Sequence, residues 1–147
     1  MNKAFVREPD FDGRAYCPKC GSLGTAVTSR TLDHHVRGEW RTQLGEHAWY
    51  CSFADCDVAY FDLFERSVTV DTLHTSVYPK DPSAPICACF GFTTDDIAAD
   101  VEEGTPTRIR ELLAKSESAE AQCHTLAADG RSCMREVQRL YLRATDA

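Results

Sequence analysis

Short runs in which apolar and polar residues alternate predict β-strands in the first half of the chain. These runs are rich in aromatic and β-branched residues, and they cover residues 25–28, 48–50, 58–61, 67–70 and 73–77. The second and third flank a turn, as expected of a hairpin, and Asp71-Thr72 is a candidate two-residue turn between the last two. The pattern therefore predicts a small antiparallel sheet. It assigns no element to the polar stretch 31–45.

The second half of the chain has a helical period instead. Apolar residues recur every three or four positions after a capping threonine at 93 or 94, again after Pro106, and again over residues 134–142. These stretches predict three short helices, the first ending near Gly104. Three short helices bury little apolar surface, so a bound cofactor is expected to help hold them together.

A proline-rich segment separates the two patterns. Residues 78–85 contain three prolines, which neither a helix interior nor a central strand accepts. We therefore expect an α+β protein with two modules. A zinc-ribbon-like antiparallel β module would cover residues 15–80, and a small helical module that binds a [2Fe-2S] cluster would cover residues 85–143.

Charge and cysteine content narrow the function. The 147 residues include 16 Lys and Arg against 23 Asp and Glu, a formal charge of −7, which disfavours binding to nucleic acid through phosphate contacts. The sequence shows neither a secretory leader nor a membrane span, so a cytoplasmic protein is expected. In that reducing compartment the eight cysteines are expected to bind metal; four disulfides are the alternative for an exported protein.

Four cysteines in the β module have the spacing of a zinc site. Cys17 and Cys20 are separated by two residues, and a tight turn with Gly21 behind it can aim both sulfurs at one metal ion. Cys51 and Cys56 form a second pair on the predicted hairpin. Four thiolates suit Zn(II), and the default role of such a closed site is structural.

The other four cysteines lie in the helical module. Cys87 and Cys89 are one residue apart before the first helix, and Cys133 directly precedes the third, with Cys123 between the two pairs. Adjacent strand positions face opposite ways, so the first two sulfurs can converge only if the backbone turns there, which Gly91 permits. The sequence therefore predicts a [2Fe-2S] cluster on these four thiols, with the helices near residues 94 and 134 directing backbone N–H groups toward it.

These features resemble the N-terminal zinc and [2Fe-2S] domain of CopZ-type copper chaperones. The resemblance rests on the Cys17-Pro18-Lys19-Cys20 and Cys51-x4-Cys56 pairs, Val58-Ala59-Tyr60-Phe61, Lys80-Asp81, Cys87-Ala88-Cys89-Phe90-Gly91, Cys123 and Asp129-Gly130-Arg131-Ser132-Cys133. It implies the same division of the eight ligands between zinc and cluster. The second half is also similar to bacterioferritin-associated ferredoxin, which has a CxC before a helix and two later cysteines.

The resemblance implies a redox protein in copper or soft-metal handling that transfers single electrons and reduces Cu(II) to Cu(I) for a separate carrier. Its partner would be a copper carrier, a transporter domain or another redox protein, because the sequence has no GMxCxxC copper site. Two alternatives stay open: a ferredoxin-like electron donor to an iron-storage or other redox partner, and an adaptor in which both metals are structural. No motif of a hydrolase, kinase or nucleotide-dependent enzyme is present, so an electron-transfer or metallochaperone role is favoured over a conventional enzyme.

Overall fold

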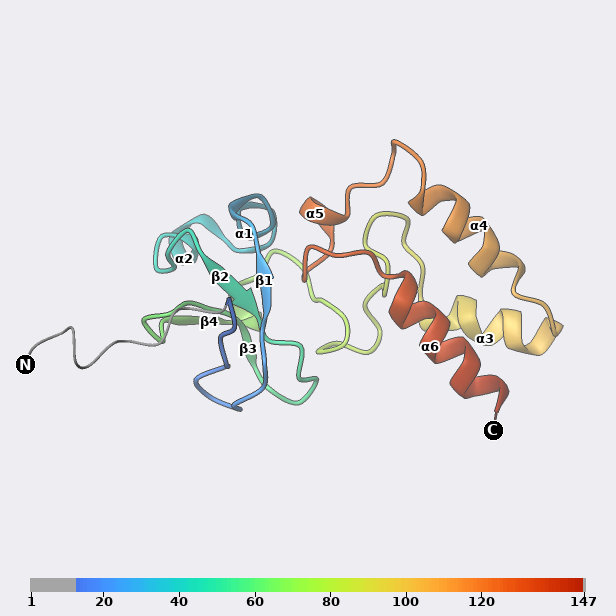
Figure 1. The fold of residues 1–147 in the computed structure, drawn as a ribbon, viewed down its shortest axis with the longest axis horizontal. Helices are drawn as coiled ribbons and strands as arrows, with labels where there is room; N and C mark the ends of the chain where they lie inside the picture. Colours follow the sequence, from blue (N-terminus) through green and yellow to red (C-terminus); the bar gives the residue numbers. More distant parts are fainter. Residues whose placement is uncertain (1–12, 147) are drawn as a thin grey trace, which may run out of the picture.

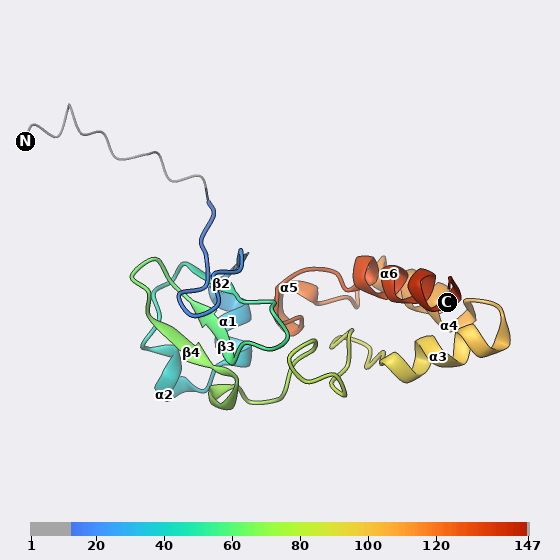
Figure 2. The same ribbon diagram turned by 90° about the horizontal axis from the view of Figure 1, so that it is seen from below.

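The structure is a computed structural model, and it describes residues 13–146 apart from the side chain of His124. Figures 1 and 2 show a four-stranded sheet with two small helices packed beside it, and the helices of the second half extend to one side of this module. The predicted α+β class is confirmed at this level.

The sheet is antiparallel, and its strands follow one another in chain order. The strands are β1 (Thr25–Val27), β2 (Ala48–Tyr50), β3 (Val58–Phe61) and β4 (Ser67–Thr69). Trp49 pairs with Phe61, and Tyr50 pairs with Tyr60, across β2 and β3. All residues of these two strands are buried, which explains why their apolar runs are nearly continuous.

The expected strand over residues 73–77 is wrong. Val70–Thr72 form a short 3-10 helix, η1, and Leu73 makes an isolated bridge with Val36. The backbone N–H of His74 donates to the carbonyl of His35, and that of Arg37 donates to the carbonyl of Thr72. The segment therefore pairs with the end of a helix that the sequence pattern did not predict.

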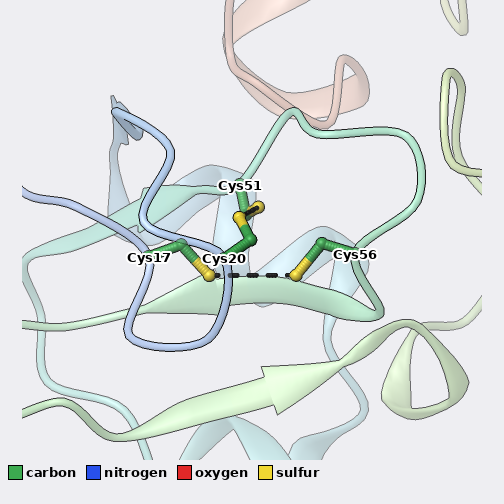
Figure 3. A group of neighbouring side chains, drawn as sticks. All are labelled: Cys17, Cys20, Cys51 and Cys56. Carbon is green, nitrogen blue, oxygen red and sulfur yellow. Dashed lines mark hydrogen bonds between the residues drawn. The ribbon is translucent and has the colours of Figure 1, made fainter.

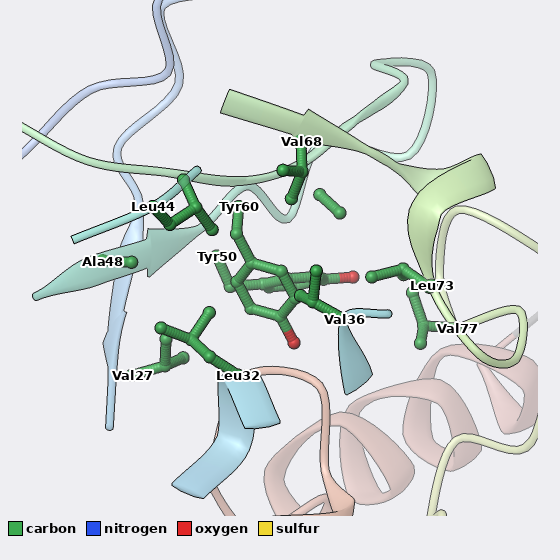
Figure 4. Close-up of a cluster of buried hydrophobic side chains, with 11 residues drawn as sticks. Val27, Leu32, Val36, Leu44, Ala48, Tyr50, Tyr60, Val68, Leu73 and Val77 are labelled. Atoms are coloured by element: carbon green, nitrogen blue, oxygen red, sulfur yellow. The ribbon is translucent and has the colours of Figure 1, made fainter. Parts of the chain in front are cut away.

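That helix is α1 (Ser29–His35), and α2 (Gly38–Arg41) follows it. The α1 side chain of Leu32, together with Val36 just beyond the helix, packs with Tyr50 and Tyr60 in the main core of the molecule. Figure 4 shows the two tyrosine rings at the centre of this cluster. Two apolar residues four positions apart were too few to reveal a helix within a polar stretch.

The second half consists of α3 (Thr94–Glu103), α4 (Thr107–Ser116), the single-turn α5 (Cys123–Leu126) and α6 (Met134–Thr145). The three longer helices lie where the sequence predicted helices, and α5 was not predicted. Their core is made mainly by Ile97, Ile109, Leu112, Met134 and Val137, with Cys87 among them. Within the described part of the chain, no helix has both the length and the apolar character that crossing a membrane requires.

Contacts join the sheet to the second half. Helix α5 lies against α1 (Figure 1). The buried hydroxyl of Tyr60 on β3 donates to the carbonyl of Ala128, which lies between α5 and α6. The hydroxyl of Tyr78 donates to Glu136 of α6 at 3.0 Å. The loop before α6 is therefore tied directly to the core of the sheet.

Candidate metal centres

Four sulfurs converge at one end of the sheet. The Sγ atoms of Cys17 and Cys56 are 3.9 Å apart, and those of Cys20 and Cys51 are 3.6 Å apart. All four Sγ atoms lie within 4.8 Å of one another, and Figure 3 shows them pointing inward from two loops. Three of the cysteines are buried, and Cys20 is partly exposed.

Two backbone turns place these sulfurs. In the first, the N–H of Gly21 donates to the carbonyl of Cys17, and Gly21 has a φ of 79°, a left-handed conformation that glycine adopts without strain. In the second, the N–H of Cys51 donates to the carbonyl of Ala59 at the end of β3, and that of Cys56 donates to Phe53. Each pair of cysteines is thus fixed by main-chain hydrogen bonds that do not involve sulfur.

The geometry fits one tetrahedral zinc ion. A Zn–S distance near 2.3 Å puts the sulfurs of a tetrahedral site about 3.8 Å apart. The Sγ–Sγ separations of 3.6 Å for Cys20 and Cys51 and 3.9 Å for Cys17 and Cys56 bracket that value. Among the residues that the structure describes, these four form the group of His, Cys, Asp and Glu side chains close enough to hold a single ion.

The thiols of this group have contrasting acidities before any metal binds. Hydrogen bonds from Ser22 lower the pKa of Cys20 to about 6, whereas burial raises the pKa of Cys51 to about 12. Burial also raises the pKa of Cys56. Zinc binds thiolates, so zinc binding would displace the protons of Cys51 and Cys56.

A lysine from the proline-rich segment supports the loop between Cys51 and Cys56. The Nζ atom of Lys80 donates to the carbonyls of Phe53 at 2.9 Å and Cys56 at 2.8 Å. Its positive charge also favours the ionised form of Cys51. Sequence analysis singled out Lys80 only through the family resemblance, because its contacts lie 24 or more residues away along the chain.

The four remaining cysteines are also brought together. The thiol of Cys133 is the largest cause that lowers the pKa of Cys87, with a smaller effect from Cys89, and after burial the charge of Cys89 raises the pKa of Cys123. Their charges are close enough for Cys87 and Cys123 to raise the pKa of Cys133, after the larger effect of its hydrogen bond to Cys87. Unlike the first set, these four do not form a single-ion group.

Cys87 and Cys89 lie in a tight hairpin loop. Cys87 and Phe92 exchange both backbone hydrogen bonds, at 3.1 and 3.2 Å, and Gly91 has a φ of 68°. The Cys133 thiol, followed by the backbone N–H groups of Phe90 and Cys89 in this loop, lowers the pKa of Cys87 to about 6. The backbone turn that the CxC spacing required is present.

The helix termini near these thiols differ from each other. Cys133 is the N-cap residue of α6, and Cys123 is the first residue of α5. The N-terminus of α3 instead forms a capping box, in which the carboxylate of Asp96 accepts the N–H of Thr93 at 2.9 Å. The sequence predicts that the N-terminus of α3 directs backbone N–H groups toward the second thiol group. The carboxylate of Asp96 already accepts a hydrogen bond at this terminus, so we expect a smaller contribution from α3.

A cavity of about 780 Å³ connects the surroundings of the two thiol groups. Ser52 and Ala54, between two cysteines of the first group, line one part of it. Ala88 and Cys133 of the second group line another, and Asp129 lies between. A small ion or chelate can therefore approach the second group from solvent.

Comparison with known proteins identifies relatives of the module that contains Cys17, Cys20, Cys51 and Cys56. Residues 14–74 match the family model zf_CopZ, described as a zinc binding domain. The fold is similar to the X-ray structure of the CopZ N-terminal domain of Archaeoglobus fulgidus, with a TM-score of 0.71, 23% sequence identity, and coverage of 86% of this chain and 97% of that one. No curated protein matches the sequence. The prediction of a CopZ-type zinc-binding domain is confirmed at this level, and the four converging thiols fit Zn(II).

Proposed function

We propose that this protein binds one zinc ion and one [2Fe-2S] cluster in two modules, residues 15–80 and 85–143, and passes single electrons in copper or other soft-metal handling. Cys17, Cys20, Cys51 and Cys56 would hold zinc. Cys87, Cys89, Cys123 and Cys133 would hold the cluster. When bound, the cluster would supply one-electron chemistry, and the zinc would supply folding energy.

The arrangement of the second four thiols carries the proposal. Each of them is close enough to others of the set to shift a thiol pKa, yet they do not form a single-ion group as the zinc set does. A two-iron cluster takes four thiolates on two metal atoms, so it needs neighbouring thiols rather than one tetrahedron. The core around Cys87 is small, and a cofactor on these residues would stabilise it.

The chain prepares this site for an anionic group. Backbone N–H groups of Phe90 and Cys89 favour the ionised form of Cys87, and Cys133 is the N-cap residue of α6. Hydrogen bonds to sulfur and a helix N-terminus both favour negative charge, and they raise the reduction potential of an iron-sulfur centre.

The proposed substrate context is copper. The matching zinc-domain model and the structural relative are both named for CopZ. Thiolates select Cu(I), so an electron donor that works beside a separate thiol-containing carrier is chemically consistent. The cavity at Cys133 would let Cu(II), as substrate, approach the second group.

The test is copper reduction by the metal-loaded protein. Protein purified without oxygen is reduced with dithionite, desalted and mixed with Cu(II) and a Cu(I)-specific chelator. We expect about one Cu(I) per chain, because an iron-sulfur cluster of this type passes one electron. The control is Cys89→Ala, which removes one thiol of the second group and leaves the zinc set whole.

Each outcome decides between functions. Loss of copper reduction in Cys89→Ala supports the proposal. If the variant reduces as much Cu(II) as the wild type, free thiols rather than a cluster are the source of the electrons. A chromophore that bleaches reversibly but reduces no copper would favour a ferredoxin-like donor to another partner. A chromophore that dithionite cannot reduce would favour a structural adaptor.

A further inference from the structure

A row of arginines lies along α6. Arg135, Arg139 and Arg143 are four residues apart and are exposed, and exposed Arg131 precedes the helix at the same spacing. Residues four apart lie on one face of a helix, so the row is continuous along α6. It stands out in a chain whose formal charge is −7.

Most of this row lacks a partner. Arg139 makes two hydrogen bonds to Glu136, at 2.7 and 2.9 Å. Within residues 13–146, no ion pair is found for Arg131, Arg135 or Arg143. Elsewhere on the helical half, Arg108 is neutralised by Asp100 and Glu103. Arg135 and Arg143 therefore offer two free guanidinium groups on one face of α6 within the described part of the chain, and Arg110 of α4, which also has no ion pair there, lies nearby in the same half of the molecule.

An apolar groove of about 330 Å³ runs beside the row, between α4 and α6. Its walls include Ile109 and Leu113 of α4 and Tyr141 and Leu142 of α6, and Arg110 lies on its rim. Leu113 is 38% exposed and Leu142 is 61% exposed, so the groove presents apolar side chains to solvent. Leu142 lies three residues after Arg139, so groove and row adjoin on the helix surface.

We propose that this face, the groove together with the arginine row, docks an acidic amphipathic helix of a partner protein. The apolar residues of such a helix would enter the groove, as in other helix-in-groove complexes, and its flanking carboxylates would meet Arg135, Arg139 and Arg143. The row begins two residues from Cys133. The groove lies beside residues 138–142, so a docked partner would cover the C-terminal half of α6 and extend toward Cys133 only along the arginine row.

Charge and shape favour a protein helix over nucleic acid. A nucleic acid needs many phosphate contacts, and the overall charge of −7 repels it. A short acidic helix needs complementary charge only along the arginine row. A nucleic acid backbone also offers nothing apolar to cover the exposed leucines. An amphipathic helix provides both kinds of contact on adjacent faces.

The probe is a fluorescent, capped peptide of about 16 residues, long enough to form a helix. It carries leucines on one face, glutamates flanking them and alanines elsewhere. A second peptide has lysine in place of each glutamate. Binding to the full metal-loaded chain is followed by fluorescence anisotropy at about 0.05 and 0.3 M salt, between which charge contacts become strongly screened.

We expect the glutamate peptide to bind and the lysine peptide to bind at least 10-fold more weakly. The double variant Arg135→Glu and Arg143→Glu should weaken the glutamate peptide at least 10-fold at low salt, and Leu142→Ser should weaken it at both salt concentrations. The matched control, Arg30→Glu and Arg37→Glu, makes the same charge change at exposed residues near α1 and should leave binding within about 2-fold.

Other results would overturn the docking site. The first is that the glutamate peptide does not bind, and the second is that both double variants lose peptide affinity equally. The third is that a single-stranded DNA oligonucleotide or an anionic vesicle binds more tightly than the peptide and also depends on Arg135 and Arg143. A dimer in sedimentation that the α6 variant dissociates would make a second copy the occupant, which also contradicts the proposal. None of these readouts depends on electron transfer, so failure of the proposed function would leave this test intact.

Discussion

At the scale of single residues, Lys80 is a support for zinc that the ligand spacing does not reveal. Its ammonium binds the carbonyls of Phe53 and Cys56, so it holds the loop on which two ligands lie. It also places a positive charge near a site that carries two net negative charges when four thiolates bind Zn²⁺. Residues that orient ligands in this way commonly change metal affinity 10- to 100-fold.

We expect Lys80→Met to release zinc about 10-fold faster to a chromogenic chelator, because the loop between Cys51 and Cys56 loses both hydrogen bonds and the nearby charge. The measurement is the rate of chelator colour development at fixed chelator concentration.

Lys19→Met is the matched control. Lys19 pairs with Asp57 at 2.6 Å, but both side chains are more than half exposed, and such pairs contribute little. Release that is unchanged in Lys80→Met, or equally fast in both variants, would remove the special role of Lys80.

At the scale of elements, Gly24 shows how closely the sheet packs just before β1. A Cβ atom at this position would lie 2.6 Å from the ring of Phe61 and 2.7 Å from Cβ of Trp49. These neighbours are buried and stacked on each other, so they have little room to move.

We therefore expect Gly24→Ala to lower the free energy of unfolding by about 1 to 3 kcal/mol through overpacking. Gly38→Ala, in α2, meets nothing within 4 Å and should be neutral or slightly stabilising. Urea unfolding followed by tryptophan fluorescence compares the two; equal stabilities would show that the strand accommodates a methyl group.

Asp100 links α3 to α4. Its fully buried carboxylate accepts the backbone N–H of Arg108 at 3.2 Å and of Ile109 at 3.0 Å, and the Arg108 guanidinium at 3.0 Å. Burial alone would raise the pKa of Asp100, but these hydrogen bonds outweigh it and hold the pKa below its ordinary value of 3.8. The ionised form is therefore the one that stabilises the helix pair.

Asp100→Asn should cost about 2 to 4 kcal/mol of unfolding free energy at neutral pH, since an amide cannot replace the charge or accept all three bonds. A lowered pKa gives stability that is present above the unfolded value near 3.8 and is lost as pH falls through the lower folded value. The difference in unfolding free energy between wild type and variant should thus stay constant above about pH 5 and become smaller as the pH falls below about 4. A gap independent of pH would assign the loss to packing.

The elements also show what the sequence pattern could and could not predict. The runs at Ala48–Tyr50 and Val58–Phe61 predicted their strands fully, because both are buried along their length. The run at 73–77 looked like a strand but pairs with the end of α1, and α1 itself was hidden in a polar stretch. Local alternation does not record which distant backbone becomes available for pairing.

At the scale of the whole molecule, the core of the sheet holds the loop between Cys123 and Cys133, which are two of the four cysteines of the second thiol group. The hydroxyl of Tyr60, a fully buried residue, donates to the carbonyl of Ala128, midway between Cys123 and Cys133. The hydroxyl of Tyr50, the cross-strand partner of Tyr60, donates to Tyr78 instead, at 3.2 Å. The two tyrosines therefore provide a matched pair for a test of this connection.

We expect Tyr60→Phe to lower the unfolding free energy by about 1 to 2 kcal/mol, since the Ala128 carbonyl loses its donor. It should also speed loss of the visible chromophore in air, while zinc content stays at the wild-type level. Tyr50→Phe should not speed that loss. Chromophore decay at one rate in both variants would show that the sheet does not control the second site.

The convergence of Cys17, Cys20, Cys51 and Cys56 could be expected from their spacing and from the proline-rich segment that separates them from the other four cysteines. The turn geometries at Gly21 and Gly91 were also within reach of the sequence, since both follow a cysteine pair closely. The roles of Lys80 and Tyr60 were not, because both side chains act on residues far away along the chain. The spacing of the cysteines along the chain can therefore indicate which residues bind metal, but the side chains that support those residues come from distant parts of the chain.

The central claim is that the two thiol groups hold different metals. The direct measurement is iron, acid-labile sulfide and zinc in one anaerobic preparation, with a visible spectrum before and after dithionite. About two iron, two sulfide and one zinc per chain, with a colour that bleaches reversibly, is the predicted result. About two zinc and no sulfide, persisting after attempted iron-sulfur reconstitution, would contradict it.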